Sequence, residues 1–227
     1  MFSKVRRIAL DIETTGLDPK LGHKIVEIGC IELDNNYPTG HYFQQYINPE
    51  REMPQEALKI HGLTTEFLKD KPVFSEIANK LLSFLKNGEL VIHNAKFDIN
   101  FLNYELDIAA KKNLEKFKII DTLLEARKIF PGAANNLDAL CRRYNIDTSK
   151  RTKHGALLDA ELLAEVFLEM NGGRQQGFNL NFESDKIQLN VTTKKEKTLY
   201  CKKIVSPDNE EVILHKKLLT KIKENFG

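Results

Sequence analysis

Residues 5–13 (VRRIALDIE) alternate in the manner of a β-strand, and one face carries three branched apolar side chains, Ile8, Leu10 and Ile12. Asp11 and Glu13 point to the opposite face, where the two carboxylates repel each other. A solvated edge strand would tolerate this pair, whereas the strongly apolar first face favours a central strand with a polar pocket on one side. Ionised pairs persist in such pockets mainly when a cation neutralises them.

Further strands and helices follow along the chain from this segment. Apolar strand patterns recur at 25–33 and 42–47, and the turn at 16–22 makes the first two strands a hairpin. Helical periodicity then begins near Phe74, and the later elements are a strand at 90–93, a short strand near 118–120, and helices at 97–110, 122–130, 137–144 and 156–170. Antiparallel strands followed by alternating helices and strands predict an α/β sheet layered with helices.

Two more acids interrupt apolar helix faces. Asp98 lies on the stripe of the 97–110 helix, and Asp159 lies on that of the 156–170 helix. An acid in a first helical turn is often only a favourable partner of the helix dipole. Together with Asp11 and Glu13, however, they make four acids facing inward, and such hard oxygen ligands suit Mg²⁺ or Mn²⁺.

His154 precedes Asp159 by five residues, which is about 140° on an ideal helix. The two side chains would therefore not share a helix face, and we expect His154 in the preceding loop or at the cap, within reach of the acids. A neutral imidazole there suits a general base. The alternative is an exposed loop histidine without a role.

Charge and cysteine content restrict the class of protein. The net charge of the 227 residues is +2, and the basic excess lies in residues 171–227, with 11 Lys and Arg against 7 Asp and Glu. The first 170 residues are slightly acidic, so any nucleic-acid chemistry there needs recruited cations or specific contacts. Cys30, Cys141 and Cys201 fit neither a zinc site nor a disulfide scaffold, which favours a reducing cytoplasm. No apolar run approaches the ~20 residues that span a bilayer.

The composition changes after Met170. Residues 171–181 are rich in Gly, Gln and Asn, as linkers are. A strand at 199–205 and an amphipathic helix at 211–226 are expected beyond it, and the apolar stripe of that helix comprises Leu214, Leu218, Ile222 and Phe226. This tail is too short to bury much core alone, so we expect it to dock on a second protein.

Four segments, taken in order, resemble the DEDDh (DnaQ-like) 3′→5′ exonucleases over roughly residues 5–170. The three exonuclease motifs are matched by residues 11–17 (DIETTGL), 93–98 (HNAKFD) and 154–159 (HGALLD), the last with the form H-x(4)-D. Residues 60–64 (IHGLT) are similar to the segment between the first two motifs. The resemblance implies an RNase H-like fold, with a mixed five-stranded sheet flanked by helices.

The resemblance also implies site residues. It makes Asp11, Glu13, Asp98 and Asp159 the ligands of two Mg²⁺ or Mn²⁺ ions ~4 Å apart, with His154 as the base. Implied contacts to the terminal nucleotide come from Asp11, Glu13, Asp159, Thr14, Thr15, Leu17, Glu56, His61 and Asn94. Ordinary roles remain open for several of these: turn residues for the threonines and Asn94, a helix-end histidine for His61 and a solvated acid for Glu56.

Within the family, the chain looks most like the proofreading (epsilon) branch of bacterial DNA polymerase III, because Gly172-Gly173-Arg174-Gln175 follows the last catalytic helix. The resemblance implies an exonuclease domain at 1–171, a linker at 172–190 and a segment at 191–227 that docks on the polymerase alpha subunit. Residues 175–178, with Gln175 and Phe178, resemble a degenerate sliding-clamp peptide, for which a passive linker is the alternative. The implied substrate is a single-stranded or frayed 3′ DNA end.

Other functions share parts of this pattern. A free-standing DEDDh exoribonuclease of the RNase T or oligoribonuclease kind has the same catalytic residues, but it has no need of the tail. A non-catalytic scaffold joining polymerase to clamp would not need the intact set Asp11, Glu13, Asp98, His154 and Asp159. A metal-binding protein without turnover is disfavoured by the turn at 14–17 and by the spacing of His154.

Overall fold

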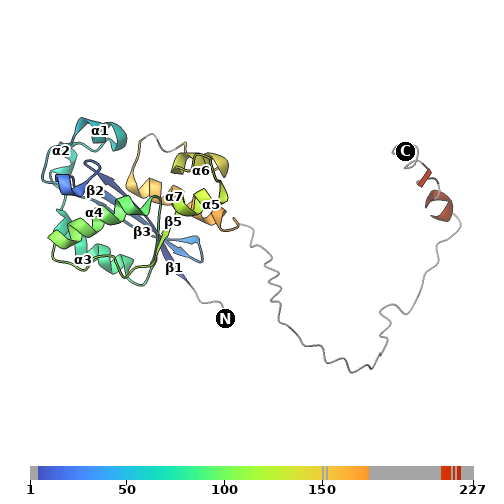
Figure 1. Cartoon of the computed structure of the whole chain (residues 1–227), viewed down its shortest axis with the longest axis horizontal. Coiled ribbons are helices and arrows are strands. Elements are labelled where there is room, and N and C mark those ends of the chain that lie inside the picture. The colour runs from blue at the N-terminus through green and yellow to red at the C-terminus, as the bar shows by residue number, and fades with distance from the viewer. Residues whose placement is uncertain are drawn as a thin grey trace, which may run out of the picture. The chain divides into compact units, whose positions relative to one another are not determined.

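The computed structural model describes residues 5–149, 151, 153–173, 211–215, 217 and 219–220. Its centre is a five-stranded sheet of order β3-β2-β1-β4-β5 (Figure 1). The strands are β1 (Arg6–Thr14), β2 (Ile25–Asp34), β3 (Tyr37–Tyr46), β4 (Glu89–Ile92) and β5 (Ile119–Asp121). The first three pair antiparallel, and β4 pairs parallel with both β1 and β5. The predicted mixed five-stranded α/β sheet is confirmed, with β1 at its centre.

Seven α-helices and a short 3-10 helix, η1 (Pro19–Leu21), accompany this sheet in the described part of residues 5–173. The helices are α1 (Gln55–His61), α2 (Thr65–Leu68), α3 (Phe74–Leu85), α4 (Ala95–Ile108), α5 (Thr122–Ile129), α6 (Leu137–Arg143) and α7 (Ala156–Met170). The predicted helix bounds agree with α3 to α7 within two residues, whereas α1 and α2 were not predicted, because segments this short show no helical period.

The two faces of β1 pack against different helices (Figure 1). Ile8, Leu10 and Ile12 join a buried cluster with residues of α3 and α4. On the other face, Ala9 packs with residues of α7, including Leu163. This second face therefore places Asp11 and Glu13 beneath α7.

Gly29 of β2 lets α7 approach the sheet closely. A Cβ atom at this position would lie 2.3 Å from backbone atoms of Ala156, so only glycine fits without a shift. The N-terminal end of α7 is thereby held against β2, next to the end of β1. This contact fixes the position of the first turn of α7 and of the residues just before it, relative to the end of β1.

Asp121 holds the start of α4, the helix that carries the predicted site residue Asp98. Its carboxylate accepts hydrogen bonds from the backbone N–H groups of Asn94 (3.2 Å), Ala95 (3.1 Å) and Leu123 (2.9 Å). One side chain thus holds the first turns of both α4 and α5. Because β1 and β4 are parallel, the start of α4, with Asp98, lies at the same edge of the sheet as the end of β1.

The C-terminal part is described over a few residues only. Residues 211–215, 217, 219 and 220 are helical, and exposed apolar side chains here are Val212, Ile213, Leu214 and Leu219. The predicted strand at 199–205 and the residues Gln175, Phe178, Leu218, Ile222 and Phe226 lie outside the described residues. The chain divides into compact units of residues 1–179 and 180–227, a boundary that falls within 172–190. Among the helices described, none has the length and apolar character needed to cross a bilayer.

Candidate active site

Four carboxylates converge from one strand and two helices. Asp11 and Glu13 lie two residues apart on β1, Asp98 lies in the first turn of α4, and Asp159 lies in the first turn of α7. Glu13, Asp98 and Asp159 are buried, with 9%, 3% and 4% of their surface exposed, and Asp11 is half-buried. Buried acids are costly without a counter-charge, so this grouping signals a functional site.

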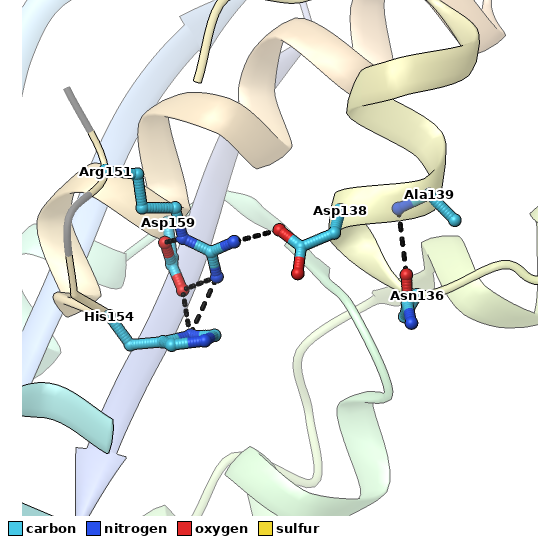
Figure 2. Close-up of polar contacts among 6 residues, drawn as sticks. All are labelled: Asn136, Asp138, Ala139, Arg151, His154 and Asp159. Carbon is cyan, nitrogen blue, oxygen red and sulfur yellow. Dashed lines mark hydrogen bonds and ion pairs between the residues drawn. The ribbon is translucent and has the colours of Figure 1, made fainter. Parts of the chain in front are cut away.

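His154 lies in the loop before α7, as its spacing from Asp159 predicts. Its Nδ1 atom is 3.1 Å from Asp159 Oδ2 (Figure 2). One oxygen of Glu13, one of Asp159 and a ring nitrogen of His154 all lie within 4.8 Å of one another. Two carboxylates and an imidazole at this separation are a donor set that a divalent cation accepts.

A cavity of about 490 Å³ adjoins this cluster. Its lining includes six of the predicted site residues, Glu13, Thr14, Thr15, Leu17, Glu56 and His61. Leu17 is 84% exposed, which leaves its side chain free to contact a ligand. Asn94 lines a separate cavity with residues of α5 and of the segment before α6, so the structure does not bring it into this group.

Buried polar contacts hold the wall of the 490 Å³ cavity. Thr14 Oγ1 donates a 2.6 Å hydrogen bond to the carbonyl oxygen of Gly16, and Thr15 Oγ1 accepts one of 2.9 Å from Lys24 N–H. His61 Nδ1 accepts a hydrogen bond from Leu63 N–H (3.0 Å). Burial lowers the pKa of His61, so its ring is neutral at pH 7 and presents an N–H at Nε2.

Comparison with known proteins assigns a family to this arrangement. The Exonuclease family (RNase_T) matches residues 8–167. The chain belongs to this exonuclease family. The DNA polymerase III subunit epsilon of Rickettsia conorii is 52% identical over 225 residues, which cover 97% of this chain and 98% of that protein. The protein of the same name from Escherichia coli K12 is 43% identical over 232 residues, with 98% and 95% covered. The predicted family resemblance is therefore confirmed.

A solved structure supports the fold of the exonuclease. The nuclease domain of 3′hExo, described as a DEDDh family member bound to rAMP, superimposes with a TM-score of 0.64 at 20% identity. The match covers 75% of this chain and 93% of that domain. This likeness confirms the RNase H-like arrangement of sheet and helices predicted from the sequence.

Burial, with a smaller contribution from neighbouring acids, raises the pKa values of carboxyl groups at the site. Burial raises the pKa of Asp11 well above its usual range, and the charges of Asp98, Glu13 and Asp159 raise it further. Burial likewise raises the pKa of Glu13 to about 8, with Asp159 and Glu27 adding to the effect. Burial is also the main reason that the pKa of Asp98 is raised. Without cations the cluster therefore retains protons, which is the behaviour of a site built for more positive charge.

We expect the stability of the metal-free exonuclease to fall as pH rises from about 4.5 to about 8. Glu13 binds its proton more tightly in the folded than in the unfolded chain. The resulting stabilisation is complete below pH 4.5 and is lost as pH passes through about 8. Melting temperatures recorded in EDTA between about pH 6 and about pH 9 measure this loss, and added Mg²⁺ should reduce it.

Glu13→Gln is the informative variant for this pH dependence, because it keeps the shape but cannot ionise. Its melting temperature should change less with pH than that of the wild type. Glu115→Gln, at an exposed position, is the matched control and should keep the wild-type slope. A Glu13→Gln protein with the full wild-type slope would show that other groups cause the loss.

The structure adds residues that the sequence analysis did not single out. Glu27, on β2, accepts hydrogen bonds from the N–H of Ala156 (3.0 Å) and from Gln44 Nε2 (2.8 Å). It therefore anchors the start of α7, and its signal is a lone acid in the apolar run 25–31. Arg151 contacts Asp159, His154 and Asp138 (Figure 2). Its only sequence signal is a basic cluster before His154.

Proposed function

We propose that the chain is the proofreading 3′→5′ exonuclease of a replicative DNA polymerase and releases nucleoside 5′-monophosphates from a single-stranded or frayed 3′ DNA end. The observation that carries this proposal is the cluster of Asp11, Glu13, Asp98, His154 and Asp159 beside the 490 Å³ cavity. Relatives named DNA polymerase III subunit epsilon, which align over nearly the whole chain, favour the replicative role. A mismatched end is easier to unpair, so selectivity needs no reading of the base.

The four carboxylates are proposed to hold two divalent cations, Mg²⁺ or Mn²⁺. Their fit rests on the hard oxygen donors and on burial, which raises the pKa values of Asp11, Glu13 and Asp98 and makes their ionised forms costly without a cation. Such cations supply charge neutralisation to the anionic phosphodiester and to the departing 3′-oxygen. Asp159 completes the set from α7.

His154 is the proposed general base. Its imidazole takes a proton from the attacking water, whose oxygen then bonds to phosphorus as the bond from phosphorus to the 3′-oxygen breaks. The departing 3′-oxygen takes up a proton and becomes the hydroxyl group of the new 3′ end. No covalent intermediate with the protein is needed. The His154 side chain is 45% exposed, which leaves room for both water and substrate.

The cavity residues are proposed to hold the terminal nucleotide. Leu17, exposed at its rim, offers an apolar contact to a base, and the buried His61 lines the same cavity. Thr14, Thr15 and Glu56 add polar groups to the same wall. The role proposed for Asn94 is indirect: its backbone, at φ 65°, forms the turn that starts α4 and so places Asp98.

A degradation assay tests the function directly. The full-length protein is incubated with mismatched primer–template DNA, with the paired equivalent and with a short RNA, each with Mg²⁺ and with EDTA. We expect Mg²⁺-dependent shortening from the 3′ end, fastest on the mismatched DNA. Preference for RNA would instead identify a free-standing exoribonuclease, and binding without cleavage would indicate a scaffold.

The C-terminal segment is proposed to bind the polymerase alpha subunit, with Gln175 and Phe178 reaching the sliding clamp. Support comes from the helical residues near 211–220, whose apolar side chains Ile213 and Leu214 are 54% and 65% exposed. The free, buried Cys30 and Cys141 are compatible with the cytoplasmic location proposed for such an assembly.

Truncation after Asn181 is expected to leave degradation of single-stranded DNA nearly unchanged and to abolish co-purification with the polymerase. The tether raises the local concentration of exonuclease to roughly millimolar without forming the active site. In the full chain, Leu214→Asp should weaken polymerase binding far more than the control Lys217→Glu on the same helix. Unfolding of the truncated protein, or unchanged polymerase binding, would contradict this two-part organisation.

A further inference from the structure

Arg151 places a permanent positive charge inside the cluster of catalytic acids. Its side chain is only 8% exposed. Nη2 donates a 2.7 Å hydrogen bond to Asp159 Oδ2, and Nε lies 2.6 Å from Asp159 Oδ1, as an ion pair without hydrogen-bond alignment. The guanidinium therefore engages both oxygens of the carboxylate that is proposed to bind metal (Figure 2).

The same guanidinium also faces the proposed base. Arg151 Nη2 is 2.7 Å from His154 Nδ1. A guanidinium donates hydrogen bonds and accepts none, so in the contact with Arg151 the Nδ1 atom is the acceptor and the ring hydrogen lies on Nε2. A ring hydrogen on Nδ1 would instead serve the 3.1 Å contact of the same atom with Asp159 Oδ2. In the first arrangement Arg151 occupies the free lone pair on Nδ1 of His154, and that nitrogen cannot take a proton from water.

Asp138 offers a second acid to the arginine. It lies in the first turn of α6, its side chain is 52% exposed, and it contacts Nη1 of Arg151, on the side of the guanidinium away from His154 (Figure 2). Asn136 caps this helix through Ala139 N–H (2.8 Å), which fixes the turn that carries Asp138. An arginine released from Asp159 thus has a fixed partner at the rim of the site.

We propose that Arg151 is the resident counter-ion of the metal-free site, which engages Asp159 and His154 until a divalent cation displaces it toward Asp138. The inference rests on the proposed function, because it takes Asp159 as a metal ligand. A divalent cation and the guanidinium compete for the same two oxygens of the Asp159 carboxylate. Each of them neutralises this carboxylate when the other is absent. Displacement frees Asp159 and His154 together, so metal binding and exposure of the base are coupled.

Binding of Mn²⁺ to the full-length protein, in the absence of DNA, tests the competition. Titration followed by the Mn²⁺ electron paramagnetic resonance signal should show roughly tenfold or tighter binding in Arg151→Met than in the wild type, since charged hydrogen bonds no longer have to break. Arg142→Met, at an exposed arginine on α6, makes the same change in net charge and should alter the affinity by less than about twofold. Arg151→Lys keeps the charge without the forked contact and should give an intermediate affinity.

A double-mutant cycle tests Asp138 as the receiving partner. Asp138→Asn should weaken Mn²⁺ binding in the wild-type background, because the displaced Arg151 loses its partner. It should have little effect in Arg151→Met, which has no arginine at this position. A ¹⁵N spectrum of the His154 ring should also show Nε2–H in the metal-free wild type, and a different tautomer balance in Arg151→Met.

The outcomes separate this inference from the proposed function. Unchanged or weaker Mn²⁺ binding in folded Arg151→Met and Arg151→Lys would overturn the competition while leaving the exonuclease assignment intact. An equal loss on Asp138→Asn in both backgrounds would overturn the role of Asp138. A wild-type protein that binds no Mn²⁺ would overturn both the inference and the proposed metal site.

Discussion

Asp11→Ala is expected to lower the rate of 3′-end degradation by roughly 10³-fold or more while the protein stays folded. The carboxylate of Asp11 shares the site with those of Glu13, Asp98 and Asp159, whose charges all act on it. Its removal leaves the proposed cation site one ligand short and misplaces the positive charge that the phosphodiester needs. The measurement is the single-turnover rate on mismatched primer–template DNA at saturating Mg²⁺.

The same variant should raise the melting temperature of the metal-free protein near neutral pH. Burial and neighbouring acids raise the pKa of Asp11, so this carboxyl destabilises the fold once it ionises. Asp107→Ala, at an exposed aspartate of α4, is the matched control and should change neither quantity appreciably. Near-normal turnover by Asp11→Ala would rule out the proposed metal site.

Periodic segments made most of the fold predictable. The alternation in residues 5–13 appears in the structure as β1, and the helix predicted at 156–170 is α7 with the same bounds. Both elements are long, and their core-facing apolar side chains recur with the period of a strand or of a helix. The inward position of Asp98 and Asp159 follows from the same reasoning, because each interrupts an apolar stripe that turns out to be buried.

Short and exposed elements could not be predicted in this way. β3 begins at Tyr37, five residues before the predicted start, because this edge strand is mostly exposed and lacks apolar alternation. The turn that precedes it uses Asn35 and Asn36 with positive φ values of 50° and 74°, which is a two-residue hairpin signal. α1 spans seven residues and α2 four, less than two helical turns each.

The contacts of Arg151 and Glu27 depend on tertiary structure and so lay beyond sequence reasoning. Glu27 acts across 129 residues of sequence on the N–H of Ala156, and the approach that permits it is made by Gly29. Arg151, which precedes α7, contacts Asp159 across eight residues of sequence. In the sequence, Glu27 stands out as an acid in an apolar strand and Arg151 as a basic residue near a histidine. Neither signal indicates the partner of the side chain.

His154→Ala is expected to reduce turnover by ~10²–10⁴-fold with little change in affinity for single-stranded DNA. The imidazole lies 3.1 Å from Asp159 and borders the proposed metal ligands, but its proposed role is to accept a proton rather than to hold the nucleotide. Rates under single turnover, and DNA affinity in Ca²⁺ by fluorescence anisotropy, separate these two effects.

The pH dependence distinguishes a base from a merely structural histidine at this position. A base must be neutral to act, so the wild-type rate should rise with pH on its acidic side, and this limb should disappear in His154→Ala. His41→Ala, at an exposed histidine of β3, is the control and should keep both the rate and the profile. If His154→Ala retained the wild-type profile at a reduced rate, another group would take the proton, and His154 would act only by orienting Asp159.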